Sequence, residues 1–325
     1  MSKSLRIVVS IYEQKALKKK AIFLMGPTAA GKTDAAIYLH EKYACDIISV
    51  DSALVYRQMD IGTAKPDKAT LKKAPHALVD IIDPWQAYSA ANFVKDAYSL
   101  MQASLAENKT PLLAGGTMLY YRSLQQGLSK LPDANAEIRQ ELEQLADKIG
   151  WNAMHQRLSK IDSESAQRIN KNDPQRISRA LEVHAITGKT MTQLHQQDQG
   201  NKLDYDVLKI IIAPERALLH KRIEQRFEIM LKQGFIQEVE KLKANEKINL
   251  DMPSMRCVGY RQVWQYLQGD IDYEEMIFRG IVATRQLAKR QWTWLRKEEN
   301  AIWLDSTKQG YLDKIKQLTS DFLEK

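Results

Sequence analysis

The stretch from Ala21 to Thr33 reads AIFLMGPTAAGKT, and it decides the fold class. Five apolar residues precede Gly26-Pro27-Thr28-Ala29-Ala30-Gly31-Lys32-Thr33, which matches the pattern GxxxxGK[ST]. This pattern predicts a phosphate-binding loop between a buried strand and a helix, because its backbone amides can turn inward onto phosphate oxygens. Lys32 is expected to reach the terminal phosphates and Thr33 to hold Mg²⁺. The loop therefore predicts a bound di- or triphosphate, without saying which one.

Short apolar runs recur along the chain with helical patterns between them, as is typical of a parallel sheet buried on both faces. This alternation predicts an α/β fold, with a P-loop NTPase-like parallel sheet core flanked by helices. The expected helices of the core are Lys32–Tyr43, Ala90–Glu107, Pro214–Gln233 and Ile271–Lys297. The expected strands are Ala21–Met25, Asp46–Val50, Ala77–Ile82, Pro111–Ala114, Val207–Ala213 and Ala301–Leu304.

The alternation stops over residues 127–203, where only helical patterns and polar loops occur, and this predicts an all-helical insertion domain. Pro132-Asp133 is expected to open one of its helices. Asp173-Pro174 is expected to open another, because Asp caps free amides and Pro suits the first helical position. The predicted domains are a P-loop α/β core (21–126 plus 204–325), the insertion (127–203) and an N-terminal extension (1–20).

Two polar segments follow strands that should end at the same edge as the phosphate loop. Asp51 follows the second expected strand, and ligands of open α/β sheets bind at the carboxyl ends of strands. Its carboxylate could hold Mg²⁺, remove a proton from an acceptor, or only cap its own loop. Gly115-Gly116-Thr117 follows the fourth strand, either for close approach of a ligand or as a plain turn. ATPases usually have an aspartate at the end of such a strand. Its absence here weakens the interpretation of the chain as an ATPase.

Composition and charge limit the classes of protein to which the chain can belong. The 325 residues carry a net charge of +8 with a pI of about 9.2, which suits a polyanionic partner but does not require one. Cys45 and Cys257 have neither disulfide-framework nor metal spacing, so we expect a reducing, cytoplasmic location. No apolar run approaches the roughly 20 residues of a membrane helix. A monomer that makes no membrane contact is expected.

Arginines gather in two segments that could contact phosphates. Arg176 and Arg179 are three residues apart on one helical face. Arg256 and Arg261 flank a glycine and the aromatic ring of Tyr260. Arginine suits phosphate and rings suit stacked bases, although a cluster of this kind taken alone is more often a solvated surface.

The chain strongly resembles tRNA dimethylallyltransferases, also called tRNA isopentenyltransferases, of the bacterial type. The resemblance extends from Ala21 to Asp305 and leaves out the first twenty residues. Its motifs are GPTAAGKT from Gly26, DSALVYRQMDIGTAKP from Asp51, GGTMLYYRSLQQGL from Gly115, DPQRISRALEV from Asp173, RCVGYRQ from Arg256 and TRQLAKRQ from Thr284.

The resemblance implies a reaction and a set of roles. Dimethylallyl pyrophosphate would donate its five-carbon group to the exocyclic amine of the adenosine 3′ to the anticodon, in tRNAs that read codons starting with U. Asp51 would be the base, the phosphate loop would bind the pyrophosphate, and Thr117 would contact tRNA near the reacting base. The implied tRNA contacts are Asp51, Ser52, Ala53, Leu54, Thr117, Arg139, Gln175, Arg176, Ile177, Ser178, Arg179, Arg256, Cys257, Val258, Gly259, Tyr260 and Arg261.

Two other functions use the same motifs. A small-molecule or nucleoside kinase would bind ATP at the loop and use Asp51 as base for a hydroxyl, but it leaves the basic insertion and the missing aspartate unexplained. A P-loop protein that binds RNA without chemistry would leave the donor uncleaved. The resemblance favours the transferase.

Overall fold

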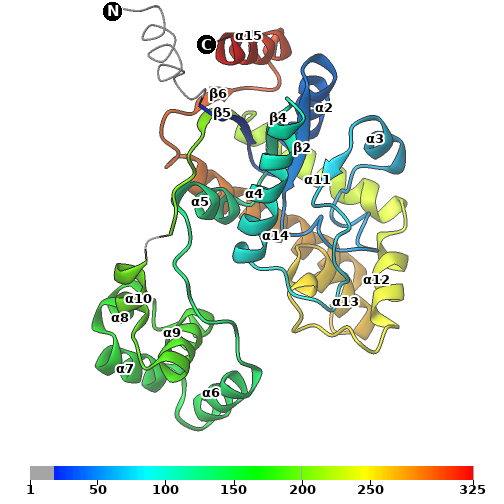
Figure 1. The fold of residues 1–325 in the computed structure, drawn as a ribbon. Helices are drawn as coiled ribbons and strands as arrows, with labels where there is room; N and C mark the ends of the chain where they lie inside the picture. Colours follow the sequence, from blue (N-terminus) through cyan, green and yellow to red (C-terminus); the bar gives the residue numbers. More distant parts are fainter. Residues whose placement is uncertain (1–17, 199, 325) are drawn as a thin grey trace, which may run out of the picture. The chain divides into compact units, whose positions relative to one another are not determined.

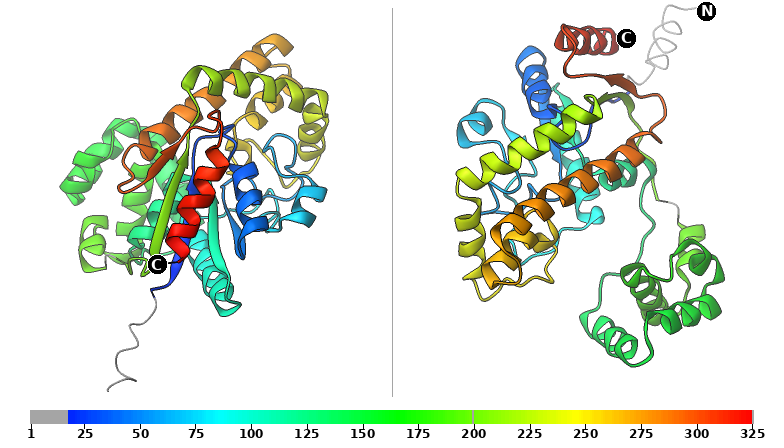
Figure 2. Two further views of the ribbon diagram at one scale, coloured as in Figure 1. Left: turned by 90° about the horizontal axis from the view of Figure 1, so that it is seen from above. Right: turned by 180° about the vertical axis from the view of Figure 1, so that it is seen from behind.

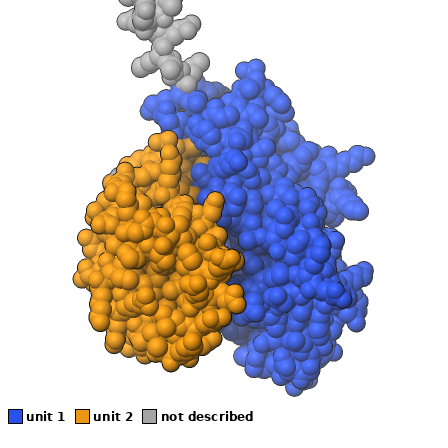
Figure 3. Space-filling model, turned by 60° about the horizontal axis from the view of Figure 1, so that its bottom comes forward, with its two compact units in different colours: residues 1–122, 204–325 blue, residues 123–203 orange. Residues whose placement is uncertain are grey.

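The computed structural model describes residues 18–198 and 200–324. Within them the chain forms two compact units, residues 1–122 with 204–325 and residues 123–203, coloured blue and orange in Figure 3. Most of the predicted N-terminal extension, residues 1–17, lies outside the described range. Lys20, its last residue, begins the first strand of unit 1.

A six-stranded parallel sheet forms the centre of unit 1 (Figure 1). Its strands lie in the order β3-β2-β4-β1-β5-β6, so β4 separates β1 from β2. Register places Gly115 beside both Met25 and Val50, which brings the ends of these three strands to one level. The predicted α/β class with a parallel sheet flanked by helices is confirmed. The strands are β1 Lys20–Met25, β2 Cys45–Val50, β3 His76–Ala77, β4 Thr110–Gly115, β5 Asp206–Ile212 and β6 Ile302–Leu304.

Helices cover both faces of the sheet because the strands are apolar on both. On one face Ile22 and Leu24 of β1 pack with α2 and α15. On the other, Tyr121 of α5 lies 5.1 Å from the ring of Phe23 and donates its hydroxyl to the Leu113 carbonyl at 2.8 Å. The helices of unit 1 are α2 Lys32–Lys42, α3 Lys68–Lys73, α4 Ala90–Ala106, α5 Met118–Gln126 (which continues into unit 2), α11 Arg216–Lys232, α12 Phe235–Lys243, α13 Tyr260–Gln268, α14 Tyr273–Leu295 and α15 Tyr311–Leu323.

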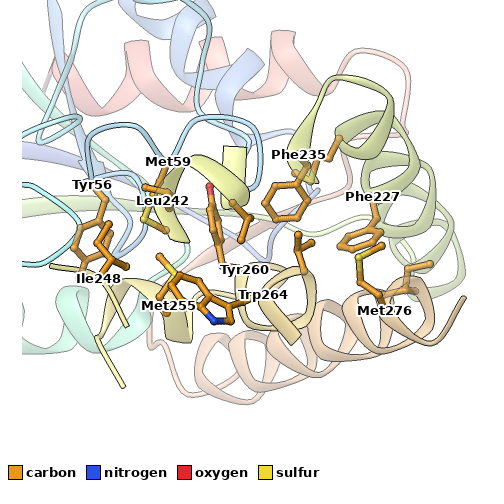
Figure 4. Packing of buried hydrophobic residues seen from close by; sticks show 14 of the residues in the cluster. Tyr56, Met59, Phe227, Phe235, Leu242, Ile248, Met255, Tyr260, Trp264 and Met276 are labelled. Carbon is orange, nitrogen blue, oxygen red and sulfur yellow. The ribbon is translucent and has the colours of Figure 1, made fainter. Parts of the chain in front are cut away.

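The helices after β5 build a second hydrophobic core. In the rear view of Figure 2, α11 and α14 run side by side, and the two helices are in contact. Phe235 of α12 meets the ring of Tyr260 edge-on at 5.0 Å, and both side chains are buried (Figure 4). Tyr56 and Met59 from the loop after β2 enter the same cluster. This core therefore anchors the loop that follows Asp51.

The predicted third strand, Ala77–Ile82, is mostly wrong. Only His76–Ala77 pairs with β2 as a strand. Leu78 and Asp80 have φ angles of 63° and 56°, which break the extended conformation. Ile82 instead makes an isolated bridge to Tyr56 and packs against the second core. Its apolar character serves that core rather than the sheet.

Unit 2 contains five helices in its described part, beside the last residues of α5. Asp173 caps α9 as predicted, by accepting a hydrogen bond from the Arg176 amide, and Gly188 ends the helix in the left-handed region. Pro132-Asp133 does not open a helix. Asn135 caps α6 instead, because its side chain accepts from the Ile138 amide. The helices are α6 Ala136–Ile149, α7 Trp151–Ile161, α8 Ser163–Arg168, α9 Pro174–Thr187 and α10 Met191–Gln197.

Candidate active site

The phosphate loop joins β1 to α2 at the carboxyl edge of the sheet. Gly31 has a φ of 92° at the start of α2, a conformation that only glycine adopts without strain. Lys32 and Thr33 are the first two residues of that helix, so their amides point toward the loop. The Lys32 ammonium donates to the Pro27 carbonyl at 2.7 Å. The loop thus offers an anion site at a helix N-terminus. The other loop residues are Gly26, Thr28, Ala29 and Ala30.

Lys32 carries an unusually acidic ammonium. Its pKa falls from 10.5 to about 8, mainly because of burial; the negative charge of Asp51 opposes this effect and the positive charge of Arg226 adds to it. A partly desolvated cation of this kind gains from an arriving phosphate.

Asp51 directly follows β2 and is half-buried. Burial raises its pKa, against the lowering effects of the Ala53 amide, Lys32 and the Leu54 amide. Its Oδ1 accepts hydrogen bonds from the amides of Ala53 at 2.8 Å and Leu54 at 3.4 Å. The loop-capping interpretation therefore describes a real contact. A carboxylate with a raised pKa beside a lysine is also a suitable proton acceptor.

Thr117 lies beside the Asp51 loop, as the strand order requires. Its amide donates to the Val50 carbonyl at 3.1 Å, and its Oγ1 accepts from the Ser52 amide at 3.0 Å. The structure thus brings the phosphate loop, Asp51 and Thr117 together at adjacent strand ends.

The sequence analysis did not single out three polar side chains that lie beside the phosphate loop. A cavity of about 470 Å³ beside the phosphate loop is lined by Arg222 and Arg226 of α11, together with Gly31. Burial lowers the pKa of Arg226, whose charge in turn acts on Lys32. Gln291 of α14 bonds to the amide of Thr28. The four-residue spacing of the two arginines on one helical face was the available signal for them, and Gln291 is the last residue of the motif TRQLAKRQ that carries part of the resemblance.

The segment from Arg256 to Arg261 divides into exposed and buried residues. Arg256 and Arg261 are exposed and line a cavity of about 440 Å³ with Cys257 and Val258. Burial, and then the charge of Asp51, raises the pKa of Cys257 to about 12, which makes it an inert thiol close to Asp51. Gly259, in the left-handed region, precedes α13.

Tyr260, the ring predicted to stack on a base, is fully buried in the second core. Its hydroxyl donates to Glu238 Oε1 at 2.6 Å. Glu238 also accepts the amides of Asp60, Ile61 and Gly62, so the tyrosine helps hold the loop that follows Asp51. Its side chain has no free face for a base.

Two of the arginines that the resemblance implies as tRNA contacts instead bind one buried carboxylate within unit 2. Glu182 of α9 has no solvent exposure. Arg139 donates to it from Nε at 2.9 Å and Nη2 at 3.2 Å, and Arg179 donates from Nη1 at 2.7 Å. The Asn135 amide adds a fourth hydrogen bond at 2.8 Å. These bonds hold the pKa of Glu182 below its usual range despite burial.

The remaining implied contacts on α9 differ in exposure. Gln175 and Arg176 are exposed, Ser178 is half-buried, and Ile177 is buried in the core of unit 2. The insertion is not basic as a whole, because residues 123–203 hold 11 Lys and Arg against 10 Asp and Glu. The positive charge excess of the chain lies almost entirely outside it.

Glu182→Gln should destabilise the protein by on the order of 2 kcal/mol, because the neutral amide leaves two arginines without their shared counter-charge. The measurement is denaturant unfolding of the full chain near neutral pH. Glu143→Gln, at an exposed position of α6, is the matched control. Equal stability of the two variants would mean that the buried carboxylate contributes nothing net.

In the described part of the chain, no three His, Cys, Asp or Glu side chains gather so as to hold a metal ion by themselves. Within residues 18–198 and 200–324, no helix has the length and apolar character needed to cross a bilayer.

The family model described as IPP transferase matches residues 54–298, and the model described as isopentenyl transferase matches residues 19–81. Among solved structures, the tRNA isopentenylpyrophosphate transferase of Bacillus halodurans is 34% identical, with a TM-score of 0.69, over 94% of this chain and 97% of that one. The tRNA delta(2)-isopentenylpyrophosphate transferase of Staphylococcus epidermidis is 32% identical, with a TM-score of 0.67, over 94% and 99%.

A eukaryotic dimethylallyltransferase described as acting on tRNA shares the fold. Its TM-score is 0.80 at 24% identity, over 94% of this chain and 80% of that one. The first family model spans most of the chain, and two solved relatives exceed 30% identity over nearly all of it. This chain therefore belongs to the IPP transferase family.

Proposed function

We propose that this protein transfers a dimethylallyl group from dimethylallyl pyrophosphate to the exocyclic amine of an adenosine in tRNA. Family membership carries the proposal: the chain is a prenyltransferase of the kind that its relatives' names describe, tRNA isopentenylpyrophosphate transferases. The meeting of a phosphate loop with Asp51 at one sheet edge agrees with it.

The reaction forms a carbon–nitrogen bond and breaks a carbon–oxygen bond. The amine nitrogen attacks the first carbon of the prenyl group, and pyrophosphate leaves with the bonding electron pair. The amine is a weak nucleophile because its lone pair is shared with the adenine ring, so loss of its proton during attack helps. Asp51 accepts that proton, a contribution of typically about 10²–10⁴-fold.

The leaving pyrophosphate gathers negative charge that the phosphate loop is built to meet. The loop amides and the N-terminus of α2 supply hydrogen-bond donors, and Lys32 supplies a dehydrated ammonium. Arg226 lies close enough to lower the pKa of Lys32, which places a second cation beside the same site. Stabilisation of the departing charge is therefore the main work of this loop.

The residues fit Mg²⁺ as part of the site. The ion prefers hard oxygen ligands and usually takes only one or two from the protein, with the rest from phosphates and water. The hydroxyl of Thr33 would hold it, since Thr33 is the second residue of α2. When bound, the ion would neutralise charge on the pyrophosphate.

The acceptor is proposed to be the adenosine 3′ to the anticodon, in tRNAs reading codons that start with U. An anticodon loop is folded, so the target base must leave its stack before it reaches Asp51. The exposed guanidiniums of Arg176, Arg256 and Arg261 are suited to the RNA backbone. We further propose a monomer in the cytoplasm.

The kinase alternative gains no support. The relatives that cover nearly the whole chain are prenyltransferases by name, and β4 ends in Gly115-Gly116-Thr117 rather than an aspartate.

The decisive experiment mixes the protein with Mg²⁺, dimethylallyl pyrophosphate and an unmodified tRNA carrying adenosine next to the anticodon. Mass spectrometry of the digested tRNA should find one five-carbon unit on that adenosine. If the mass of the tRNA stays unchanged and added ATP is consumed instead, the protein would be assigned as a kinase rather than a transferase.

A further inference from the structure

Gln291 of α14 binds two loops that follow different strands. Its Oε1 accepts a hydrogen bond from the Thr28 amide at 2.9 Å, and its Nε2 donates to the Gly116 carbonyl at 3.0 Å. Thr28 belongs to the phosphate loop after β1, and Gly116 to the turn after β4. Since both ends of the amide are engaged, its orientation is fixed.

The hydrogen bonds continue from Gly116 to the neighbourhood of Asp51. The next residue, Thr117, accepts the Ser52 amide at 3.0 Å through its Oγ1. Asp51 in turn accepts the Ala53 amide at 2.8 Å. These hydrogen bonds, joined through the backbone of Gly116-Thr117 and Asp51-Ser52, therefore link the phosphate loop to the loop that carries the carboxylate.

The Gln291 amide fits closely against Gly116 and the phosphate loop. A Cβ atom added at Gly116 would lie 2.4 Å from Nε2 and 3.1 Å from the Gly26 carbonyl oxygen. The residue after Gln291, Trp292, packs with Ala288 and with Ala29 of the phosphate loop. Helix α14 is thereby fixed behind the loop, which makes the amide a rigid support rather than a mobile surface group.

We propose that Gln291 is a positioning residue that holds the phosphate loop and the Gly116-Thr117 turn at a fixed separation. It would thereby hold the binding site of the leaving pyrophosphate and the proton-accepting carboxylate of Asp51 in the positions that the transfer step needs. The proposal rests on the proposed function. A misplacement of about 1 Å at a reacting centre can cost about 10²-fold in rate. The amide therefore acts on the transfer step through the two loops without touching the reacting atoms.

The test compares Gln291→Met with Gln286→Met, an exposed glutamine on the same helix. Single-turnover transfer at saturating donor and tRNA should fall about 10–100-fold in Gln291→Met only, whereas tRNA binding and Tm should match the control. A transfer rate within about twofold of the control would overturn the proposal, since that is no larger than ordinary context-dependent variation. Loss of tRNA binding in a folded Gln291→Met protein would assign Gln291 a role in tRNA binding and also overturn the proposal.

Two further variants keep the proposal falsifiable if Gln291→Met folds poorly. Gln291→Glu keeps an acceptor for Thr28 but turns an oxygen toward the Gly116 carbonyl, so transfer should be low in a folded protein; full transfer would overturn the proposal. Gly116→Ala displaces the amide from the other side. The loss of transfer rate in Gly116→Ala and that in Gln291→Glu should not add up in the double variant. Additive losses would indicate that the two residues have independent roles.

Failure of the proposed function can be told apart from failure of this inference. If the wild type and Gln286→Met both transfer no prenyl group, the function is wrong. Binding of inorganic pyrophosphate, measured by calorimetry without tRNA, then still tests the support of the phosphate loop. Gln291→Met should bind it about fivefold more weakly, the effect of one lost hydrogen bond. Unchanged binding would overturn the inference by itself.

Discussion

Asp51→Asn should lower the rate of prenyl transfer by about 10²–10⁴-fold while leaving the fold intact, because an amide cannot accept the proton of the attacking amine. The substitution preserves the loop, since Oδ1 of asparagine can still accept the amides of Ala53 and Leu54. The measurement is single-turnover transfer to tRNA at neutral pH with saturating donor.

The control for this variant is Asp67→Asn. Asp67 also accepts a backbone amide, that of Thr70, at the start of α3, and it should tolerate the change without loss of transfer. Pyrophosphate binding should survive in Asp51→Asn, because the phosphate loop is untouched. Full turnover by this variant would remove Asp51 from the role of base and leave only its capping contact.

Lys32→Met should lower transfer by about 10²–10³-fold, the usual loss when one preorganised donor to a developing charge is removed. The same variant should raise the Tm of the free protein. Burial lowers the pKa of Lys32 to about 8, so holding its charge opposes folding until a phosphate arrives. Lys42→Met, at the exposed end of the same helix, is the control for both measurements.

The lysine also predicts the sign of two pH effects. The pKa of Lys32 in the folded protein lies below the unfolded value of 10.5, so the folded state loses this proton at a lower pH than the unfolded state does. The contribution of Lys32 to the free energy of unfolding therefore rises between pH 8 and 10.5. Donor affinity should fall as the pH rises above about 8, because the free enzyme loses the ammonium that the pyrophosphate needs. Lys32→Met should show neither trend. A wild-type donor affinity that stays constant to pH 9.5 would contradict the assignment.

The sequence predicted the elements that depend on local pattern. The apolar run before Gly26 and the spacing to Lys32 identified β1, the phosphate loop and α2. Asp173-Pro174 located the start of α9, because a cap and a helix-compatible proline act within one turn. Local pattern misled at Ala77–Ile82, where left-handed backbone at two residues sends Ile81 and Ile82 into the second core.

Side chains whose roles depend on distant contacts could not be predicted. Glu182 has the sequence character of an exposed helical glutamate, yet it is buried between Arg139 and Arg179. Tyr260 resembles a base-stacking ring in its motif, yet its hydroxyl serves Glu238. Burial is set by what packs on a residue, and the packing partners come from other parts of the chain.

The sequence by itself determined the class of fold, the phosphate-loop motif at Gly26–Thr33 and the family to which the chain belongs. These depend on short-range backbone conformation and on residue spacing, which are written in consecutive residues. Only the tertiary structure decided that Gln291 forms hydrogen bonds to two loops, that the charge of Arg226 acts on Lys32, and which arginines are exposed. Gln291 and Thr28 are 263 residues apart, and the strand order and helix packing that bring them together arise from the burial of apolar surface across the whole chain.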